Sequence, residues 1–310
     1  MAILKLKPAC KSYLWGGSRL KSEYGKEFDG DILAETWELS CHPDGPSTIV
    51  GGAYDGMTLA DYIGQAGRRV LGSNCQIFSE FPILIKFIDS HDNLSIQVHP
   101  NNVYAMETAK QYGKTEMWYI LDAKPGAFLY LGFQHEISRE EFKHRIEENT
   151  LTEVLNAVPV QKGQCFYIPA GTIHAIGKNI VIAEIQQSSN LTYRVYDYGR
   201  VGADGKPRQL HIEQALDVTK LTPPRMEYNF GGHLVRCPYF TTDVLEAPFS
   251  AVSTDESFTS LLVLEGEGEL VNGNECMTVR KGDSVFLPAE SGVYTVSGTV
   301  RLLRTEVGTI

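Results

Sequence analysis

The segment Leu94–Pro100 carries an amide and an imidazole at alternating positions of an otherwise apolar stretch. On a β-strand the side chains of Gln97 and His99 leave the same face, because successive side chains alternate between faces. Polar groups on a buried face need polar partners or a bound ion. A hydrogen bond would explain each residue alone, but Glu116 and His174 complete a set of nitrogen and oxygen donors. Such a set suits a divalent transition metal such as zinc, so we expect these four residues to form a metal site.

The chain around these residues is rich in short β-forming runs that end at turn residues. The clearest runs cover residues 81–88, 116–121, 165–168, 180–185, 260–264 and 283–287. Runs of this length and spacing predict a mainly β fold in which antiparallel strands form a sandwich or a barrel.

Three helical segments interrupt the expected strands. Residues 58–61 and 138–141 have the capping-box pattern, in which a threonine or serine and an acidic residue three positions later satisfy the free amides of a first helical turn. A third helix is expected over residues 211–221, because Pro223 and Pro224 prevent its continuation.

A short pattern of lysine, glycine and a later proline occurs at residues 162–169 and again at residues 281–288. This echo predicts a duplicated sheet unit, with one barrel in each half of the chain. The first copy leads to His174, whereas the second has no histidine at the matching place, so only the first barrel should bind metal. We therefore expect a metal-binding domain over residues 1–225 and a second barrel over residues 226–310.

Composition and charge argue against several classes of partner. Hydrophobic residues make up 43% of the 310 residues and charged residues 21%, as in an ordinary globular protein. The net charge of −10 argues against a nucleic-acid or anionic-membrane partner. No apolar run is long enough to span a membrane, and the first residues lack the apolar stretch of a secretory signal. Six scattered cysteines without paired spacing indicate reduced thiols and a cytoplasmic location. The residues do not distinguish a monomer from a homodimer.

The stretch from Gly163 to His174, with Pro169 and Gly171 between them, resembles the second motif of the cupin superfamily. A narrower resemblance is to the type I mannose-6-phosphate isomerases, in particular to their short bacterial form. The blocks that carry it follow one another in the family's order and are Tyr13–Gly17, Ala34–Ser40, Leu84–Lys86, Leu94–Pro100, Lys114–Glu116, Gly171–His174 and Ser188–Arg194. The resemblance implies two cupin-like (jelly-roll) β-barrels, with helical insertions in and around the first.

The resemblance also implies a zinc-dependent enzyme that interconverts mannose 6-phosphate and fructose 6-phosphate. One Zn²⁺ per chain would be held by Gln97, His99, Glu116 and His174, and the partner would be a small phosphorylated sugar. The reaction moves a proton between C1 and C2 through an enediol, so it needs a base and a group that stabilises negative charge on oxygen. Two alternatives are another metal-dependent cupin enzyme and a non-catalytic sugar-binding cupin.

The resemblance implies that Arg194, Lys114 and Glu184 are catalytic. Arg194 would stabilise negative charge on the enediolate or on the phosphate, because a planar guanidinium suits both. Glu184 lies in an apolar run, where an unpaired carboxylate is costly, so either a salt bridge satisfies it or it serves as a base. Lys114 lies two residues before Glu116 and would share its face if the stretch is a strand. The base is one of three groups, namely Glu184, Lys114 or a zinc-bound water, and the residues alone do not choose among them.

Ser95 and Lys86 match positions that the family associates with phosphate binding. Ser95 should share the face of Gln97, whereas Lys86 could also be a lysine at a strand end that reaches solvent. The long form of the family continues after its arginine with Gly-Leu-Thr-Pro-Lys, but this chain continues with Val195–Arg200. Arg200 either replaces that lysine as a phosphate contact or faces solvent.

Overall fold

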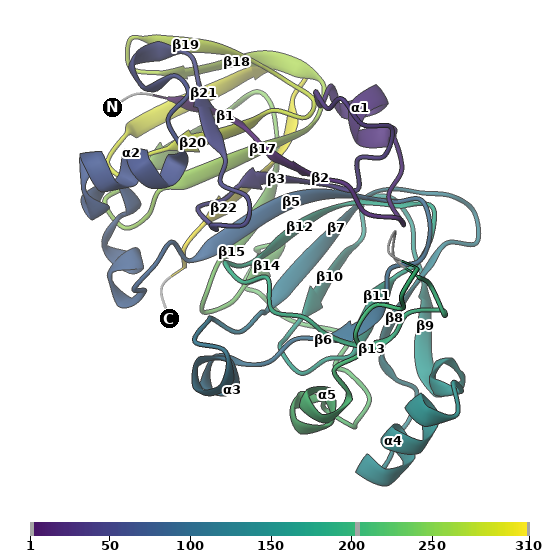
Figure 1. The fold of residues 1–310 in the computed structure, drawn as a ribbon. Coiled ribbons are helices and arrows are strands. Elements are labelled where there is room, and N and C mark those ends of the chain that lie inside the picture. The colour runs from purple at the N-terminus through teal and green to yellow at the C-terminus, as the bar shows by residue number, and fades with distance from the viewer. Residues whose placement is uncertain (1–2, 202–204, 309–310) are drawn as a thin grey trace. The chain divides into compact units, whose positions relative to one another are not determined.

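The computed structural model describes residues 3–201 and 205–308, which form antiparallel sheets with a few short helices (Figure 1). The mainly β fold expected from the sequence is confirmed. The chain divides into two compact units, the first made of Met1–Lys11, Arg19–Phe87 and Asn229–Ile310 and the second of Ser12–Ser18 and Ile88–Tyr228. Strand β5 (Ile83–Ser90) passes from the first unit into the second.

The first unit contains two sheets and a strand pair. The seven-stranded sheet has the order β14 (Val235–Arg236), β15 (Thr241–Glu246), β22 (Arg301–Glu306), β17 (Thr259–Glu265), β20 (Ser284–Leu287), β1 (Leu4–Lys7) and β4 (Thr48–Val50). The four-stranded sheet has the order β16 (Phe249–Ser253), β21 (Gly292–Gly298), β18 (Glu267–Asn272) and β19 (Glu275–Arg280). The pair consists of β2 (Ala9–Lys11) and β3 (Glu35–Leu39).

A buried apolar cluster joins the two sheets of the first unit. Leu261 and Val263 of β17 pack with Leu270 of β18 and Val296 of β21 in this cluster. Alternate residues contribute because a strand buries one of its two faces. The helices of the unit are α1 (Arg19–Tyr24), α2 (Leu59–Ala66) and the 3-10 helices η1 (Gly52–Tyr54), η2 (Arg68–Leu71) and η3 (Ser73–Ile77).

The division into units differs from the one expected, which placed residues 1–225 in one domain. Strand β1 pairs with β20, with Leu4 opposite Phe286, so the start of the chain belongs to the same sheet as its C-terminal part. Loop contacts add to this grouping, since the amides of Ser73 and Asn74 donate to the carbonyls of Asp255 and Glu256. Backbone pairing between distant segments, which no local pattern reveals, decides the grouping.

The second unit contains the strands that carry the candidate metal site. Its five-stranded sheet has the order β13 (Tyr193–Tyr196), β6 (Ile96–Val98), β11 (His174–Ile176), β8 (Phe128–Phe133) and β9 (Leu155–Pro159). A second group of antiparallel strands has β7 (Glu116–Ala123) paired with both β10 (Cys165–Ile168) and β12 (Ile180–Gln187). The helices are α3 (Asn102–Thr108), α4 (Arg139–Glu147), α5 (Ile212–Val218) and the 3-10 helix η4 (Leu151–Glu153).

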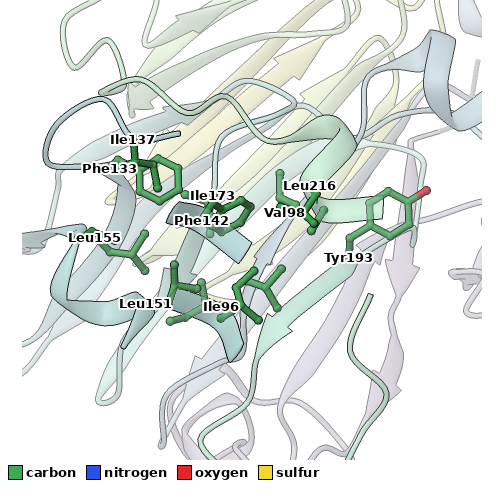
Figure 2. Packing of buried hydrophobic residues seen from close by; sticks show 14 of the residues in the cluster. Ile96, Val98, Phe133, Ile137, Phe142, Leu151, Leu155, Ile173, Tyr193 and Leu216 are labelled. Atoms are coloured by element: carbon green, nitrogen blue, oxygen red, sulfur yellow. The ribbon is translucent and has the colours of Figure 1, made fainter. Parts of the chain in front are cut away.

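One face of the five-stranded sheet packs against helices α4 and α5 (Figure 2). Ile96 and Val98 of β6 lie in one buried cluster with Phe142 of α4 and Leu216 of α5. Since neighbouring residues of a strand point to opposite faces, Gln97 must project from the other face of the sheet. The apolar contacts of the strand thereby determine where its polar residues point.

The helices and strands expected from local patterns are present. The hydroxyls of Thr58 and Ser138 accept the amides of Asp61 and Glu141 and begin α2 and α4, while α5 lies within the predicted range 211–221. The repeated pattern also has the same conformation twice. Gly163 (φ 88°) precedes β10 and Gly282 (φ 93°) precedes β20, in a backbone region that glycine adopts readily.

Within residues 3–201 and 205–308, no helix is long and apolar enough to cross a membrane.

Candidate metal centre and active site

Three of the four expected metal ligands come together in the second unit. His99, Glu116 and His174 each offer one donor atom, and these atoms lie within 4.8 Å of one another. All three side chains are buried, with at most 1% of their surface exposed. They follow β6, begin β7 and begin β11, so the cluster lies between the five-stranded sheet and the strand group of β7. Among the residues that the structure describes, this is the one such group of histidine, cysteine and acidic residues.

Main-chain carbonyl groups orient both imidazoles. Nδ1 of His99 lies 2.9 Å from the carbonyl oxygen of Leu191, and Nδ1 of His174 lies 2.8 Å from that of Thr172. A carbonyl oxygen only accepts hydrogen bonds, so each Nδ1 carries the proton and each Nε2 keeps its lone pair. Both Nε2 atoms are turned toward Glu116, at 3.8 Å for His99 and 3.2 Å for His174.

The donor set fits a metal cation. Burial lowers the pKa of His174 to about 4, which keeps its imidazole neutral near pH 7. Its Nε2 is buried and has no hydrogen-bond partner among the described residues, yet it lies beside a carboxylate oxygen. Two groups of electron pairs facing each other in a buried place repel, and a cation between them removes the repulsion. Two imidazoles and a carboxylate are ligands typical of zinc.

Gln97 lies opposite His174 in the register of β6 and β11. Directly opposed residues of an antiparallel pair project from the same face, so the amide is on the side of the metal cluster. Its assignment as the fourth ligand stays a prediction.

Lys114 and Glu184 lie beside the metal donors, as the sequence suggested. Nζ of Lys114 is 2.5 Å from Glu116 Oε2, 3.3 Å from His99 Nε2 and 3.6 Å from Glu184 Oε1. Both side chains are buried, at 5% exposure for Lys114 and 3% for Glu184. The two alternatives for Glu184, a salt bridge or a place in the site, therefore do not exclude each other. Glu184 has a charged partner in Lys114 and also lies beside the cluster of expected metal ligands.

Trp118 is a site residue that the sequence did not reveal. Its side chain is fully buried. Its indole Nε1–H also donates to Glu184 Oε2 at 3.0 Å, and its ring lies edge-on to the imidazole of His174, with centroids 5.3 Å apart. Trp118 and Glu184 are register partners on β7 and β12, so the pairing could have been inferred once the strand register was known.

Arg194 and Ser95 are in direct contact in the second unit. Nε of Arg194 donates to Ser95 Oγ at 3.2 Å, and Nη1 donates to the carbonyl oxygen of Gln209 at 3.1 Å. Arg194 is also the register partner of Gln97, which places it on the face of the sheet that carries the expected metal ligands. Burial lowers the pKa of this guanidinium, and the positive charges of Arg208 and Arg200 act in the same direction. An anion would relieve that repulsion.

Arg200 is engaged by an aspartate. Its Nη2 contacts Asp197 Oδ1 at 2.5 Å, its Nη1 donates to the carbonyl oxygen of Asn93 at 2.6 Å, and Arg208 bonds both oxygens of the same carboxylate. Burial raises the pKa of Asp197, but the hydrogen bonds from Arg208 and Arg200 outweigh it and leave that pKa lowered. Arg200 thus belongs to a small charged group with Asp197 and Arg208, and its phosphate role stays a prediction.

Lys86 belongs to the first unit, whereas the other expected site residues belong to the second. It is buried at 5% exposure, with its Nζ 3.5 Å from Glu35 Oε2 and 5.0 Å from the ring centre of Trp37. The solvent-reaching lysine considered as an alternative is therefore wrong. Its role toward phosphate stays a prediction.

Known proteins match most of this chain. Residues 3–127 match the model of the family described as phosphomannose isomerase type I, catalytic domain, and residues 232–307 match that of the mannose-6-phosphate isomerase cupin domain. The mannose-6-phosphate isomerase of Streptococcus mutans serotype c is 37% identical over 94% of this chain and 93% of its own length. Mannose-6-phosphate isomerase ManA of Bacillus subtilis strain 168 is 35% identical over 95% and 96%. A crystal structure of mannose 6-phosphate isomerase from Bacillus subtilis superposes with a TM-score of 0.90 at 33% identity, covering 98% of this chain and 99% of that one.

Proposed function

Because this chain belongs to the type I phosphomannose isomerase family, we propose that it interconverts mannose 6-phosphate and fructose 6-phosphate with the help of one bound zinc ion. The buried cluster of His99, Glu116 and His174 carries the proposal, since both Nε2 lone pairs are turned toward a carboxylate. Gln97 would complete the ligand set from the same face as His174. When bound there, zinc supplies stabilisation for the negative charge that develops on a sugar oxygen during isomerisation.

In this proposal Glu184 is the base, and Lys114 stabilises the charge that the proton transfer creates. In the forward direction a base removes the proton from C2 of the open-chain aldose, and the C1 carbonyl oxygen takes up a proton to give the enediol. A proton is then returned to C1, and the C2 hydroxyl gives up its proton and becomes the carbonyl. Glu184 is held by the Trp118 indole and is the carboxylate available as base once Glu116 is a metal ligand. The ammonium of Lys114, which lies close to the carboxylates of Glu116 and Glu184, would stabilise charge on the enediol oxygens.

The phosphate of the sugar would be bound by Arg194 and Ser95. A planar guanidinium donates two parallel hydrogen bonds to a phosphate, and a serine hydroxyl adds a third. The contact between Arg194 and Ser95 places both donors together already. Lys86 and Arg200 are the further phosphate contacts that we propose from the family resemblance.

A coupled assay tests the function directly. Fructose 6-phosphate formed from mannose 6-phosphate would be measured before chelation, after chelation and after zinc is added back. We expect turnover that is lost with the metal and regained with zinc. Metal binding without any turnover would contradict the isomerase and favour the non-catalytic sugar-binding alternative. Turnover with another metal alone would contradict zinc.

A second measurement follows the proton. In deuterated water an enediol path with exchange introduces deuterium at C1 of fructose 6-phosphate, or at C2 of mannose 6-phosphate when the reaction runs in reverse. Complete absence of label, together with full turnover, would count against a base that exchanges its proton with solvent.

We also propose a cytoplasmic location, supported by six cysteines that are all free.

A further inference from the structure

Thr115 is clamped from both sides by one buried glutamine. The backbone N–H of Thr115 donates to the side-chain Oε1 of Gln187 at 2.9 Å, and the Thr115 carbonyl oxygen accepts the backbone N–H of Gln187 at 3.1 Å. Thr115 stands directly between Lys114 and Glu116, the proposed charge-stabilising residue and the proposed carboxylate ligand. Strand β7 begins only at Glu116, so Thr115 itself is not among the strand residues of that ladder. The glutamine therefore takes the place of a strand partner at this position.

The same glutamine reaches a second anchor. Its Nε2 donates to Asn102 Oδ1 at 2.9 Å, and that oxygen also accepts the amide of Gly113 at 2.9 Å. Residues 113–116 are thus tied at Gly113 through Asn102 and at Thr115 through Gln187. Gln187 is 2% exposed, so water does not compete for these hydrogen bonds.

The clamp also extends toward His174. The hydroxyl oxygen of Thr115 accepts the amide of Ala170 at 3.2 Å, in the turn that leads to this second imidazole ligand. If the backbone of Thr115 shifts, the carboxylate of Glu116, the ammonium of Lys114 and this turn are all free to move with it. Metal ligands and catalytic groups tolerate displacements of only about 0.5 Å.

We propose that Gln187 is a positioning residue, which fixes the segment Gly113–Glu116 so that Glu116 meets the metal and Lys114 meets the sugar. The inference rests on the proposed zinc site. It assigns no contact between Gln187 and the substrate. Its effect is transmitted through the backbone of Thr115.

Substitution of Gln187 by methionine tests this role, because methionine has a similar length and lacks the side-chain amide. Zinc affinity would be measured by competition with a chromogenic chelator, which requires no turnover. We expect the affinity of Gln187→Met to fall about 10- to 100-fold, the loss typical when a partner that orients a metal ligand is removed. We also expect kcat to fall, because Lys114 is displaced together with Glu116.

Three further variants separate positioning from general stability. Asn102→Asp keeps an oxygen that accepts from both Gly113 and Gln187, whereas Asn102→Ala removes it, so the aspartate variant should bind zinc more tightly than the alanine variant. Ser138→Ala is the matched control, since it removes a side-chain acceptor of a backbone amide at the start of α4, away from the metal ligands. It should leave zinc affinity unchanged while lowering stability by about 1 kcal/mol.

The outcomes are distinguishable. Wild-type zinc affinity and wild-type kcat in Gln187→Met would overturn the inference, as would an equal loss of affinity in Ser138→Ala. If Gln187→Met does not fold, equal zinc affinity in the two Asn102 variants overturns it. Absence of zinc binding by the wild-type protein would instead overturn the proposed function itself.

Discussion

The two imidazoles of the metal cluster are held by carbonyl oxygens of loops. The carbonyl groups of Leu191 and Thr172 fix the proton of each ring on Nδ1, and they leave Nε2 of His99 and His174 with the lone pair that a cation would bind. A site prepared in this way binds its metal more tightly, because little rotamer freedom is lost on binding. The carboxylate of Glu116 supplies the charge that two neutral rings lack.

Replacement of Glu116 by glutamine tests how much the negative charge of this side chain contributes to metal binding. The shape of the side chain is nearly preserved, but an amide is a much weaker ligand than a carboxylate. We expect zinc affinity to fall by more than the roughly 100-fold that removal of an outer partner can cost. Competition with a chromogenic chelator measures it. An affinity within a few-fold of wild type would show that Glu116 is not a ligand.

Replacement of Trp118 by phenylalanine tests the orientation of Glu184. The ring is kept approximately, while the indole N–H that donates to Glu184 Oε2 is lost. A hydrogen bond to a charged group contributes about 1.5–3 kcal/mol, so we expect kcat to fall by about ten-fold or more while zinc affinity is retained. Steady-state kinetics with the zinc-loaded enzyme measure this. Unchanged kcat with full zinc content would contradict a role for this hydrogen bond.

At the scale of the elements, the five-stranded sheet separates packing from chemistry by its two faces. Ile96 and Val98 pack toward α4 and α5, while Gln97 lies on the same face as His174 and Arg194. A shift of the register by one residue would exchange the two faces, so the apolar cluster of Figure 2 protects the arrangement of the site.

Strand β13 leads into the charged group of Asp197, Arg200 and Arg208, and this group predicts a pH effect on stability. The pKa of Asp197 is lowered in the folded protein, so its stabilisation is complete above the unfolded pKa of about 3.9 and is lost as the pH falls through the folded pKa. We expect Asp197→Asn to lower the free energy of unfolding by about 1–3 kcal/mol at pH 7.

Urea unfolding of wild type and Asp197→Asn between pH 7 and pH 3 checks the sign. The difference between the two midpoints should be constant down to about pH 4 and should then become smaller. A difference that has already disappeared at a higher pH, where unfolded aspartate is still ionised, would contradict the assignment.

At the scale of the whole molecule, the proposed metal ligands all belong to the unit made of Ser12–Ser18 and Ile88–Tyr228. Binding to the folded state alone stabilises that state by mass action. The metal should therefore contribute to the stability of this unit as well as to turnover.

Chelation should lower the melting temperature of the protein. Zinc at a hundred times its dissociation constant adds about 2.7 kcal/mol, which corresponds to roughly 5–10 °C for a unit of this size. Differential scanning calorimetry with chelator, and then with excess zinc, measures the shift and its reversal. A melting temperature that is equal with and without zinc would mean that the folded protein binds zinc no better than the unfolded chain.

Local patterns in the sequence determined much of the fold. Alternation of side chains marked the strands, and the capping residues Thr58 and Ser138 marked where α2 and α4 begin. The same alternation singled out His99, and its set with Glu116 and His174 is the group that converges in the structure. These inferences succeed because the period of a strand and the hydrogen bonds of a helix cap involve residues close together in the chain.

Tertiary structure alone decided what depends on distant partners. It placed β1 beside β20 and thereby grouped the start of the chain with its C-terminal part. It also brought the Leu191 carbonyl within hydrogen-bond distance of His99 and the buried side-chain amide of Gln187 within hydrogen-bond distance of Thr115. Every residue has a backbone carbonyl, and one glutamine looks like another in a sequence. The sequence therefore does not indicate which carbonyl or which glutamine will be the hydrogen-bond partner. Only the register and packing of the strands bring the chosen pair within hydrogen-bond distance.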